Sequence, residues 1–114
     1  MRHPFSEKTA MQRYMKMLGH SRPFFLDPDY NLEMLCKDLG TNRAYASRFV
    51  NVSLGTSLPQ LLRSLRLAYA ERLRHNSPQM KISEIAQSSG FNNPTSFRRA
   101  YFAKYGCNPS EGMN

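Results

Sequence analysis

The hydrophobic residues of this chain recur at the spacing of amphipathic helices, and one short pattern occurs twice. Residues 32–40 and residues 82–90 both carry apolar or small side chains at positions i, i+3, i+4 and i+7 before a closing glycine, at an offset of 50 positions. This spacing predicts two short helices that each end at a glycine. An Asn-led segment follows each glycine and predicts a second helix, at residues 43 to about 51 and residues 94 to about 105. The sequence therefore predicts two helix-turn-helix units.

A further helix is predicted before the first unit. Ser6 is placed to cap a helix of residues 7–18, which Gly19 ends. Its apolar face is predicted to consist of Met11, Tyr14, Met15 and Leu18. Two prolines argue against a helix over residues 20–30, where the apolar Phe24, Phe25 and Leu26 are expected to pack the loop down.

The longest predicted helix lies between the two units. Ser57-Leu58-Pro59-Gln60 has the form of a capping box with proline in the first turn, and it predicts a helix that reaches about His75. The expected buried side of this helix carries Leu58, Leu61, Leu62, Leu65, Ala68, Tyr69 and Leu73. No alternating apolar and polar run of strand length occurs, so the predicted class is all-α.

The positive charge of the chain is concentrated in the repeated region. The 114 residues carry a formal charge of +8. Residues 43–104 contain ten Lys or Arg against two acidic residues, whereas the remaining segments balance at six against six. The basic character is therefore a local property of the repeats and not a general solubility device. The length fits one domain, or two small helical lobes that share a central element, and leaves no room for a large catalytic cleft.

Several function classes are not supported by the sequence. Cys36 and Cys107 do not form a disulfide framework, which favours a reduced, cytoplasmic setting. No signal peptide or apolar run near the length of a membrane span is present. The histidines are scattered without ligand spacing, and no Ser-His-Asp or paired-carboxylate arrangement can be identified. The histidines are His3, His20 and His75. We therefore expect no enzyme activity, no cofactor, no metal site and no membrane insertion.

The second helix of each unit is the candidate for reading DNA. An α-helix fits the major groove, and the side chains that reach bases lie in its first turns, opposite the core. The predicted inward residues are Ala46, Phe49 and Val50 in the first unit, and Phe97, Tyr101 and Phe102 in the second. The outward or flanking residues are Arg43, Ala44, Tyr45, Ser47 and Arg48, and then Thr95, Ser96, Arg98 and Arg99.

Two stretches of the chain resemble a known family. Residues 82–102, followed by Gly106-Cys107-Asn108-Pro109-Ser110, resemble the C-terminal signature of the AraC/XylS family of bacterial transcription regulators. Arg66-Leu67-Ala68-Tyr69-Ala70 is similar to the family's Arg-Ile-x-x-Ala motif on the long helix. The resemblance spans roughly residues 25–111.

The resemblance implies a seven-helix domain in which the linker helix rigidly spaces two helix-turn-helix subdomains. Both recognition helices would enter successive major-groove segments of double-stranded DNA, about one turn or roughly 34 Å apart. Residues 1–30 would form an N-terminal helix and loop packed on the first subdomain, residues 31–56 the first helix-turn-helix, residues 57–75 the linker helix and residues 76–111 the second helix-turn-helix. The base contacts of the family pattern fall on Arg43, Ala44, Ser47 and Arg48, and on Pro94, Thr95 and Arg99.

The chain departs from the family pattern at a few positions. Ala44 offers only a methyl group to thymine, Pro94 stands where many members have a polar reader, and Lys81 replaces the usual Ser or Thr cap. Arg66 matches a motif position for which a structural role and a DNA contact are equally open. The family usually has a sensing or dimerising domain on the N-terminal side, which is not seen here, so a fragment and a stand-alone protein are both compatible with the sequence.

Two functions from different classes follow. The first is sequence-specific binding of double-stranded DNA in transcription regulation, with RNA polymerase as a candidate second partner through which the family most often activates. The second is a helical protein-docking module that does not read DNA sequence. Matched outward arginines in both units favour the first, because a docking module does not require them.

Overall fold

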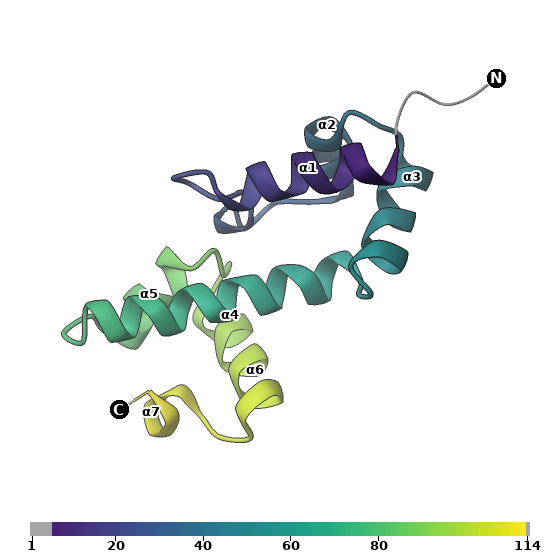
Figure 1. The fold of residues 1–114 in the computed structure, drawn as a ribbon. Helices are drawn as coiled ribbons and strands as arrows, with labels where there is room; N and C mark the ends of the chain where they lie inside the picture. Colours follow the sequence, from purple (N-terminus) through teal and green to yellow (C-terminus); the bar gives the residue numbers. More distant parts are fainter. Residues whose placement is uncertain (1–5, 114) are drawn as a thin grey trace. The chain divides into compact units, whose positions relative to one another are not determined.

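Seven α-helices make up the described part of the chain, residues 6–113 of the computed structural model (Figure 1). They are α1 (Glu7–Leu18), α2 (Leu32–Leu39), α3 (Arg43–Arg48), α4 (Leu58–Asn76), α5 (Ile82–Ser88), α6 (Pro94–Tyr105) and α7 (Pro109–Gly112). A 3₁₀ turn, η1 (Phe24–Leu26), precedes α2, and a π-helical turn, η2 (Phe49–Ser53), continues α3. Residues 6–113 contain no β-strand, so the predicted all-α class is confirmed. His3 and residues 1–5 of the predicted N-terminal segment lie outside the described residues.

Polar caps determine where the predicted helices begin. The side chains of five residues accept a hydrogen bond from the backbone N–H three positions further on, at 3.2, 3.0, 3.0, 3.4 and 2.8 Å in chain order. These residues are Ser6, Asn31, Asn42, Ser57 and Asn93. Each bond satisfies one of the N–H groups that the first helical turn leaves without an intrahelical partner. The bounds of α1, α2 and α6 are those predicted, and α4 extends one residue beyond the predicted His75.

The first recognition helix differs from its prediction in its second half. Regular α-helix ends at Arg48, and the chain continues as η2 to Ser53, with the N–H of Leu54 donating to the carbonyl of Phe49 at 3.1 Å. In a π-helical turn each backbone hydrogen bond spans five residues, one more than in an α-helix. A hydrophobic pattern with a period of 3.6 residues does not reveal this change. The prediction of one helix ending near residue 51 was therefore wrong about its geometry and its end.

The described residues divide into two compact units. The first comprises residues 6–24 and 30–61, and the second comprises residues 25–29 and 62–113. Helix α4 begins in the first unit and continues in the second, while the short segment 25–29, which lies between α1 and α2 in sequence, belongs to the second.

The core of the first unit is built by α1, α2, α3 and η2. Its buried residues include Ala10, Tyr14, Leu35, Leu39, Ala46, Phe49 and Val50. The ring of Tyr14 meets that of Phe49 edge-on, with ring centroids 5.8 Å apart. The predicted inward face of α3 is confirmed. The predicted apolar face of α1 was wrong at Met15, which is 58% exposed, because α1 packs on the core through the buried Ala10 and Tyr14, one turn apart.

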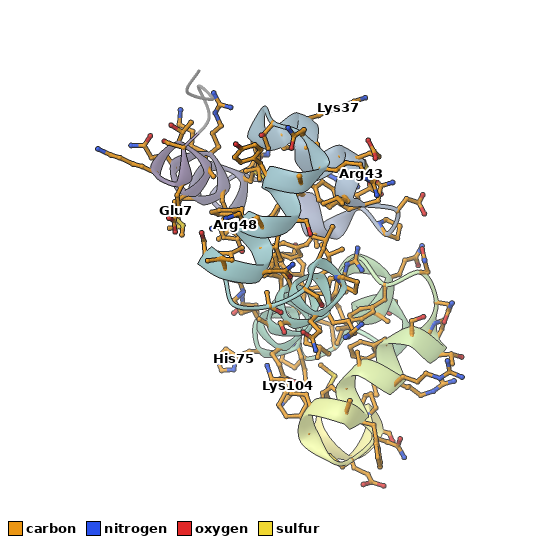
Figure 2. All side chains as sticks on the ribbon, turned by 90° about the vertical axis from the view of Figure 1, so that its right-hand side faces the viewer. Glu7, Lys37, Arg43, Arg48, His75 and Lys104 are labelled. Carbon is orange, nitrogen blue, oxygen red and sulfur yellow. The ribbon has the colours of Figure 1, made fainter. Side chains whose placement is uncertain are left out.

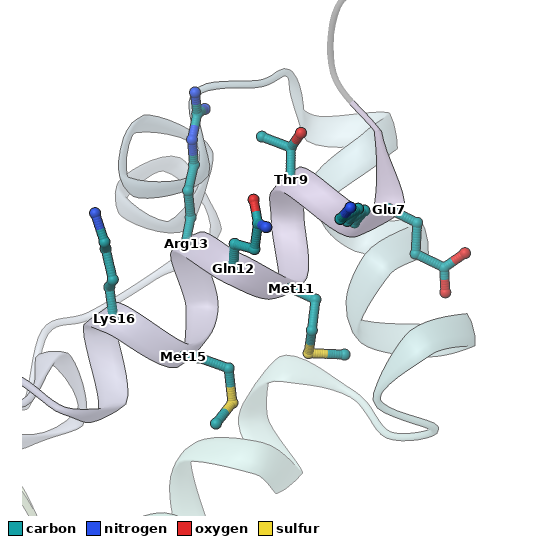
Figure 3. A pocket seen from close by; sticks show the side chains of 8 residues that line it. Glu7, Thr9, Met11, Gln12, Arg13, Met15 and Lys16 are labelled. Atoms are coloured by element: carbon teal, nitrogen blue, oxygen red, sulfur yellow. The ribbon is translucent and has the colours of Figure 1, made fainter.

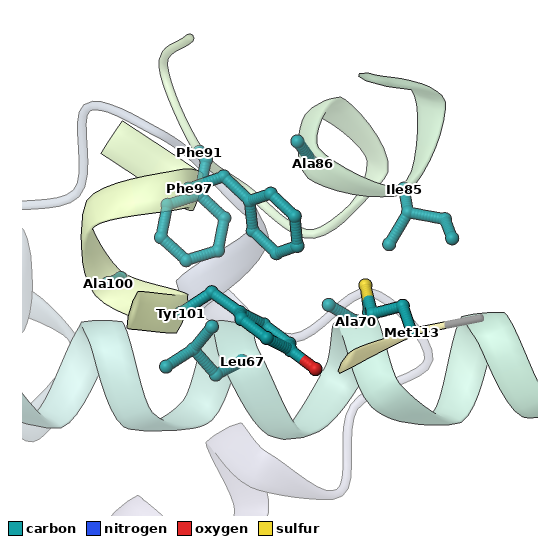
Figure 4. Packing of buried hydrophobic residues seen from close by; sticks show 9 residues of the cluster. All are labelled: Leu67, Ala70, Ile85, Ala86, Phe91, Phe97, Ala100, Tyr101 and Met113. Carbon is teal, nitrogen blue, oxygen red and sulfur yellow. The ribbon is translucent and has the colours of Figure 1, made fainter. Parts of the chain in front are cut away.

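The core of the second unit forms where α4, α5 and α6 meet (Figure 4). It consists of Leu67, Ala70, Ile85, Ala86, Phe91, Phe97, Ala100, Tyr101 and Met113.

Two predictions about the buried faces of α4 and α6 were wrong. On the predicted buried side of α4, Ala68 was wrong: it is exposed, while its neighbours Leu67 and Ala70 are buried. Phe102 is 54% exposed, because the core takes the row of Phe97, Ala100 and Tyr101.

Candidate nucleic-acid interface

Helix α3 carries the candidate readers of the first unit on the side opposite its buried residues. Arg43, Ala44, Tyr45 and Arg48 are exposed, and Ser47 is partly buried. Figure 2 shows Arg43 and Arg48 at the two ends of the helix. The helix starts at the Asn42 cap, so its first turn presents its polar and basic side chains to solvent while Ala46 anchors it to the core.

Two hollows flank this helix. A cavity of about 160 Å³ is lined by Glu7, Tyr45, Arg48, Phe49, Val52 and Ser53, and the Ser53 hydroxyl donates to Glu7 Oε1 at 2.7 Å. An open groove of about 470 Å³ at the start of α3 has Glu33, Lys37, Thr41, Asn42 and Arg43 among its lining residues. In this groove the guanidinium of Arg43 forms an ion pair with the carboxylate of Glu33.

A larger open depression runs along α1 (Figure 3). It measures about 1120 Å³ and is lined by Met11 and Met15 together with polar and charged side chains of the same helix. These lining residues offer no His, Cys or paired carboxylates for acid–base or nucleophilic chemistry. Over residues 6–113 as a whole, no group of three or more His, Cys, Asp or Glu residues is placed to hold a metal ion.

Helix α6 is the corresponding element of the second unit. Asn93 caps it and Pro94 takes the first helical position, as predicted. Phe97 is fully buried and fixes the helix to the core. The five candidate readers Pro94, Thr95, Ser96, Arg98 and Arg99 are all exposed. The guanidinium of Arg98 donates to the Thr95 hydroxyl at 3.4 Å, which joins two of these side chains.

An arginine from another element lies against the turn glycine of each helix-turn-helix. In the first unit, Arg13 of α1 donates to the carbonyl of Leu39 at the end of α2 and lies beside Gly40. In the second unit, Arg66 of α4 lies beside Gly90. Both glycines have a positive φ, +73° and +92°, which favours glycine because a side chain there is strained. The two arginines thus brace the turns that set the angle of the recognition helices.

Arg66 has a structural role. Its Nε donates to the carbonyl of Phe25 at 2.7 Å and its Nη2 to the carbonyl of Asp27 at 2.9 Å. Burial lowers the pKa of this guanidinium, and the charge of Asp27 opposes the shift. Of the two readings of Arg66 that the sequence left open, the structure supports the structural one. The family motif singled out Arg66 without deciding between the two roles, whereas the brace formed by Arg13 had no signal in the sequence.

The start of α5 is capped by Glu84 and not by the side chain of Lys81. Lys81 stands at the cap position, and its backbone N–H donates to Glu84 Oε1 at 3.0 Å. A lysine side chain has no acceptor for the N–H groups of the first turn. Glu84 therefore supplies half of a capping box from within the helix.

Two helix pairs with tight glycine turns, each presenting an exposed basic second helix, define a helix-turn-helix protein. The sequence model of the helix-turn-helix domain family matches residues 35–114. The chain belongs to this family, and its helix-turn-helix domain is of the AraC type.

Relatives and solved structures agree with this assignment. The HTH-type transcriptional activator RhaR of Salmonella dublin is 26% identical over 106 residues, which cover 93% of this chain and 36% of the relative. The chain therefore spans about a third of the length of the curated relatives it matches. The C-terminal domain of AraT, a response regulator from Geobacillus stearothermophilus, is similar with a TM-score of 0.76, 25% identity and coverage of 96% of this chain and 85% of that one.

A third similar structure is the DNA-binding domain of AdpA, a global transcriptional factor, in complex with a target DNA. It has a TM-score of 0.78 at 21% identity and covers 92% of this chain and 89% of that one. At this identity the likeness shows a shared fold.

Among residues 6–113, no helix combines the length and the apolar character needed to span a membrane.

Proposed function

We propose that this chain is the DNA-binding domain of a transcription regulator and that it reads double-stranded DNA with α3 and α6 in successive major-groove segments. The observation that carries the proposal is the matched construction of these two helices. Each is fixed by a buried aromatic or small residue on one side and exposes polar and basic side chains in its first turns on the other. Base readout needs this arrangement, because only the outward side chains of the first turns reach base edges.

Each candidate reader has a role suited to its chemistry. Arg43, Arg48 and Arg99 can donate bidentate hydrogen bonds to guanine, which is the commonest specific contact in the major groove. Ala44 offers a methyl group to the methyl of thymine, and Thr95 and Ser96 offer hydroxyls to either kind of base edge or to a phosphate. The candidates Tyr45, Ser47, Pro94 and Arg98 complete the proposed contact surface, in which Arg98 donates to the Thr95 hydroxyl.

The relatives support both the ligand and the direction of control. RhaR is named a transcriptional activator, and the AdpA domain was solved with a target DNA. We extend both properties to this chain: it binds an operator in the cytoplasm of a bacterium and activates transcription through contact with RNA polymerase. A sensing or dimerising domain elsewhere in the complete regulator fits the length of the relatives.

Selection of bound duplexes from a random DNA pool tests the proposal. Two short enriched blocks about one helical turn apart, roughly 10 base pairs between centres, are expected if both helices read bases. Titration of the selected duplex at two salt concentrations should show log K falling by about 0.9 per neutralised phosphate for each log unit of salt. A single block would restrict base reading to one unit. No enrichment, with little duplex binding at physiological salt, would favour the protein-docking module instead.

A further inference from the structure

The ion pair of Glu33 and Arg43 places a carboxylate beside a candidate base reader. Glu33 is the second residue of α2, and Arg43 is the first residue of α3. The contact joins Arg43 Nη1 to Glu33 Oε1. Both side chains remain open to solvent, with exposures of 65% and 62%, so a ligand can reach the pair from outside.

The pair lies in the groove at the start of α3, where a second cation is present. Lys37 lines the same groove and stands four positions after Glu33 on α2, which places both on one face of that helix. The groove at the start of α3 is therefore lined by two cations, Lys37 and Arg43, and one carboxylate, Glu33. This is the part of the recognition helix that would face DNA. The carboxylate offsets half of the positive charge that the groove would otherwise present to a phosphate.

The geometry of the pair leaves part of the guanidinium available. A guanidinium has five N–H donors in a planar fork, and the contact with Glu33 uses Nη1. The edge formed by Nε and Nη2 remains free of that contact and can donate two parallel hydrogen bonds to O6 and N7 of guanine. Glu33 thereby holds the fork in one orientation before DNA arrives, which reduces the side-chain entropy lost when a base is bound.

We propose that Glu33 is a positioning residue that sets the sequence discrimination of the first unit through Arg43. The inference rests on the proposed function of α3. On a cognate duplex the oriented fork binds guanine. On unrelated DNA, Arg43 can contribute only through phosphates, and the negative charge of Glu33 disfavours a phosphate at this place. The carboxylate thus weakens non-specific binding more than cognate binding.

The substitution Glu33→Gln tests this proposal, because it keeps the size of the side chain and removes its charge. Affinity for an unrelated duplex should rise by about 1.4- to fivefold, the range expected for an exposed ion pair. Affinity for the selected duplex should stay the same or fall, so the ratio of the two affinities decreases. The salt dependence on unrelated DNA should steepen by up to about 0.9, because Arg43 becomes available to one more phosphate.

Two further variants separate positioning from a general charge effect. Glu111→Gln removes the same charge from α7 and should leave the affinity ratio unchanged. In an Arg43→Ala background, Glu33→Gln should no longer change the ratio, because the group that it positions is absent. Circular dichroism of each variant verifies that the helices are retained.

The outcomes separate this inference from the proposed function. Equal changes on both duplexes, or no change on either, would overturn the role of Glu33 while leaving DNA reading by the wild-type chain intact. A changed base preference at a cytosine position would also overturn it, since Glu33 would then be a direct reader. If the wild-type chain enriches no duplex, the proposed function and this inference fail together.

Discussion

The backbone of Gly90 lies directly against the carbonyl oxygen of Phe25, within the second unit. A Cβ atom on this glycine would overlap that oxygen and would come within 3.0 Å of the Cα of Leu26. The same oxygen accepts the hydrogen bond from Arg66 Nε at 2.7 Å. The turn between α5 and α6 is therefore packed against the segment 25–29 with no space for a side chain, and the orientation of α6 depends on that contact.

Gly90→Ala is expected to destabilise the protein by about 2–4 kcal/mol, because it adds a backbone clash to the strain of a positive φ. Gly106→Ala is the matched control. Gly106 also has a positive φ, +73°, but a Cβ there meets nothing within 4 Å, so its cost should be only about 1–2 kcal/mol. Urea unfolding of both variants gives the comparison. Equal losses would mean that the contact with Phe25 has no energetic weight.

Arg66→Met should lower the free energy of unfolding by about 2 kcal/mol, because two hydrogen bonds from a half-buried charged group to backbone carbonyls are lost. Arg63→Met, one turn earlier on the exposed side of α4, should change it by no more than about 0.5 kcal/mol. The measurement is again urea unfolding. Loss of duplex affinity by Arg66→Met at unchanged stability would assign Arg66 to DNA instead.

Local chemistry explains why the helix boundaries could be predicted. A cap such as Asn42 or Asn93 bonds to the backbone three residues on, so both partners are visible within a few letters of sequence. The outward position of Arg48 and Arg99 follows in the same way from the period of the helix once Ala46 and Phe97 are recognised as its anchors.

Features that depend on distant residues could not be predicted in this way. The brace by Arg13 reaches a carbonyl 26 positions further along the chain, and no local pattern encodes it. The exposure of Met15 and Phe102 depends on which neighbouring element covers which side of an apolar stripe. Periodicity locates such a stripe only to within about one residue, or roughly 100° of rotation, so its edges are the least certain positions.

The stability of the protein should fall at alkaline pH through Tyr30. Tyr30 is a buried residue, and its hydroxyl donates to Asp38 Oδ2 at 2.6 Å. Burial raises the pKa of this hydroxyl well above its usual range, and the hydrogen bond and charge of Asp38 raise it further. Above about pH 10 the unfolded chain releases this proton while the folded chain retains it, so rising pH favours unfolding. The stabilisation is fully present below that pH.

Tyr30→Phe isolates this contribution. The variant loses the hydrogen bond at every pH, so its unfolding midpoint in urea should be lower than that of the wild type at pH 8. Between pH 8 and about pH 11 its midpoint should fall less steeply, because one titrating group has been removed. Parallel curves for the two proteins would show that Tyr30 does not carry the alkaline dependence.

Arg48→Ala and Arg99→Ala test whether the two recognition helices read bases. Each should weaken binding of the selected duplex by about 1–3 kcal/mol if the guanidinium is bidentate to guanine, with a much smaller effect on unrelated DNA. In a repeated selection, Arg48→Ala should lose preference within one enriched block and Arg99→Ala within the other, since the residues belong to different units. Arg22→Ala removes one exposed charge outside both recognition helices and should spare both blocks. Equal losses on selected and unrelated duplexes would assign Arg48 and Arg99 to phosphates, because a phosphate contact lowers affinity for every sequence alike.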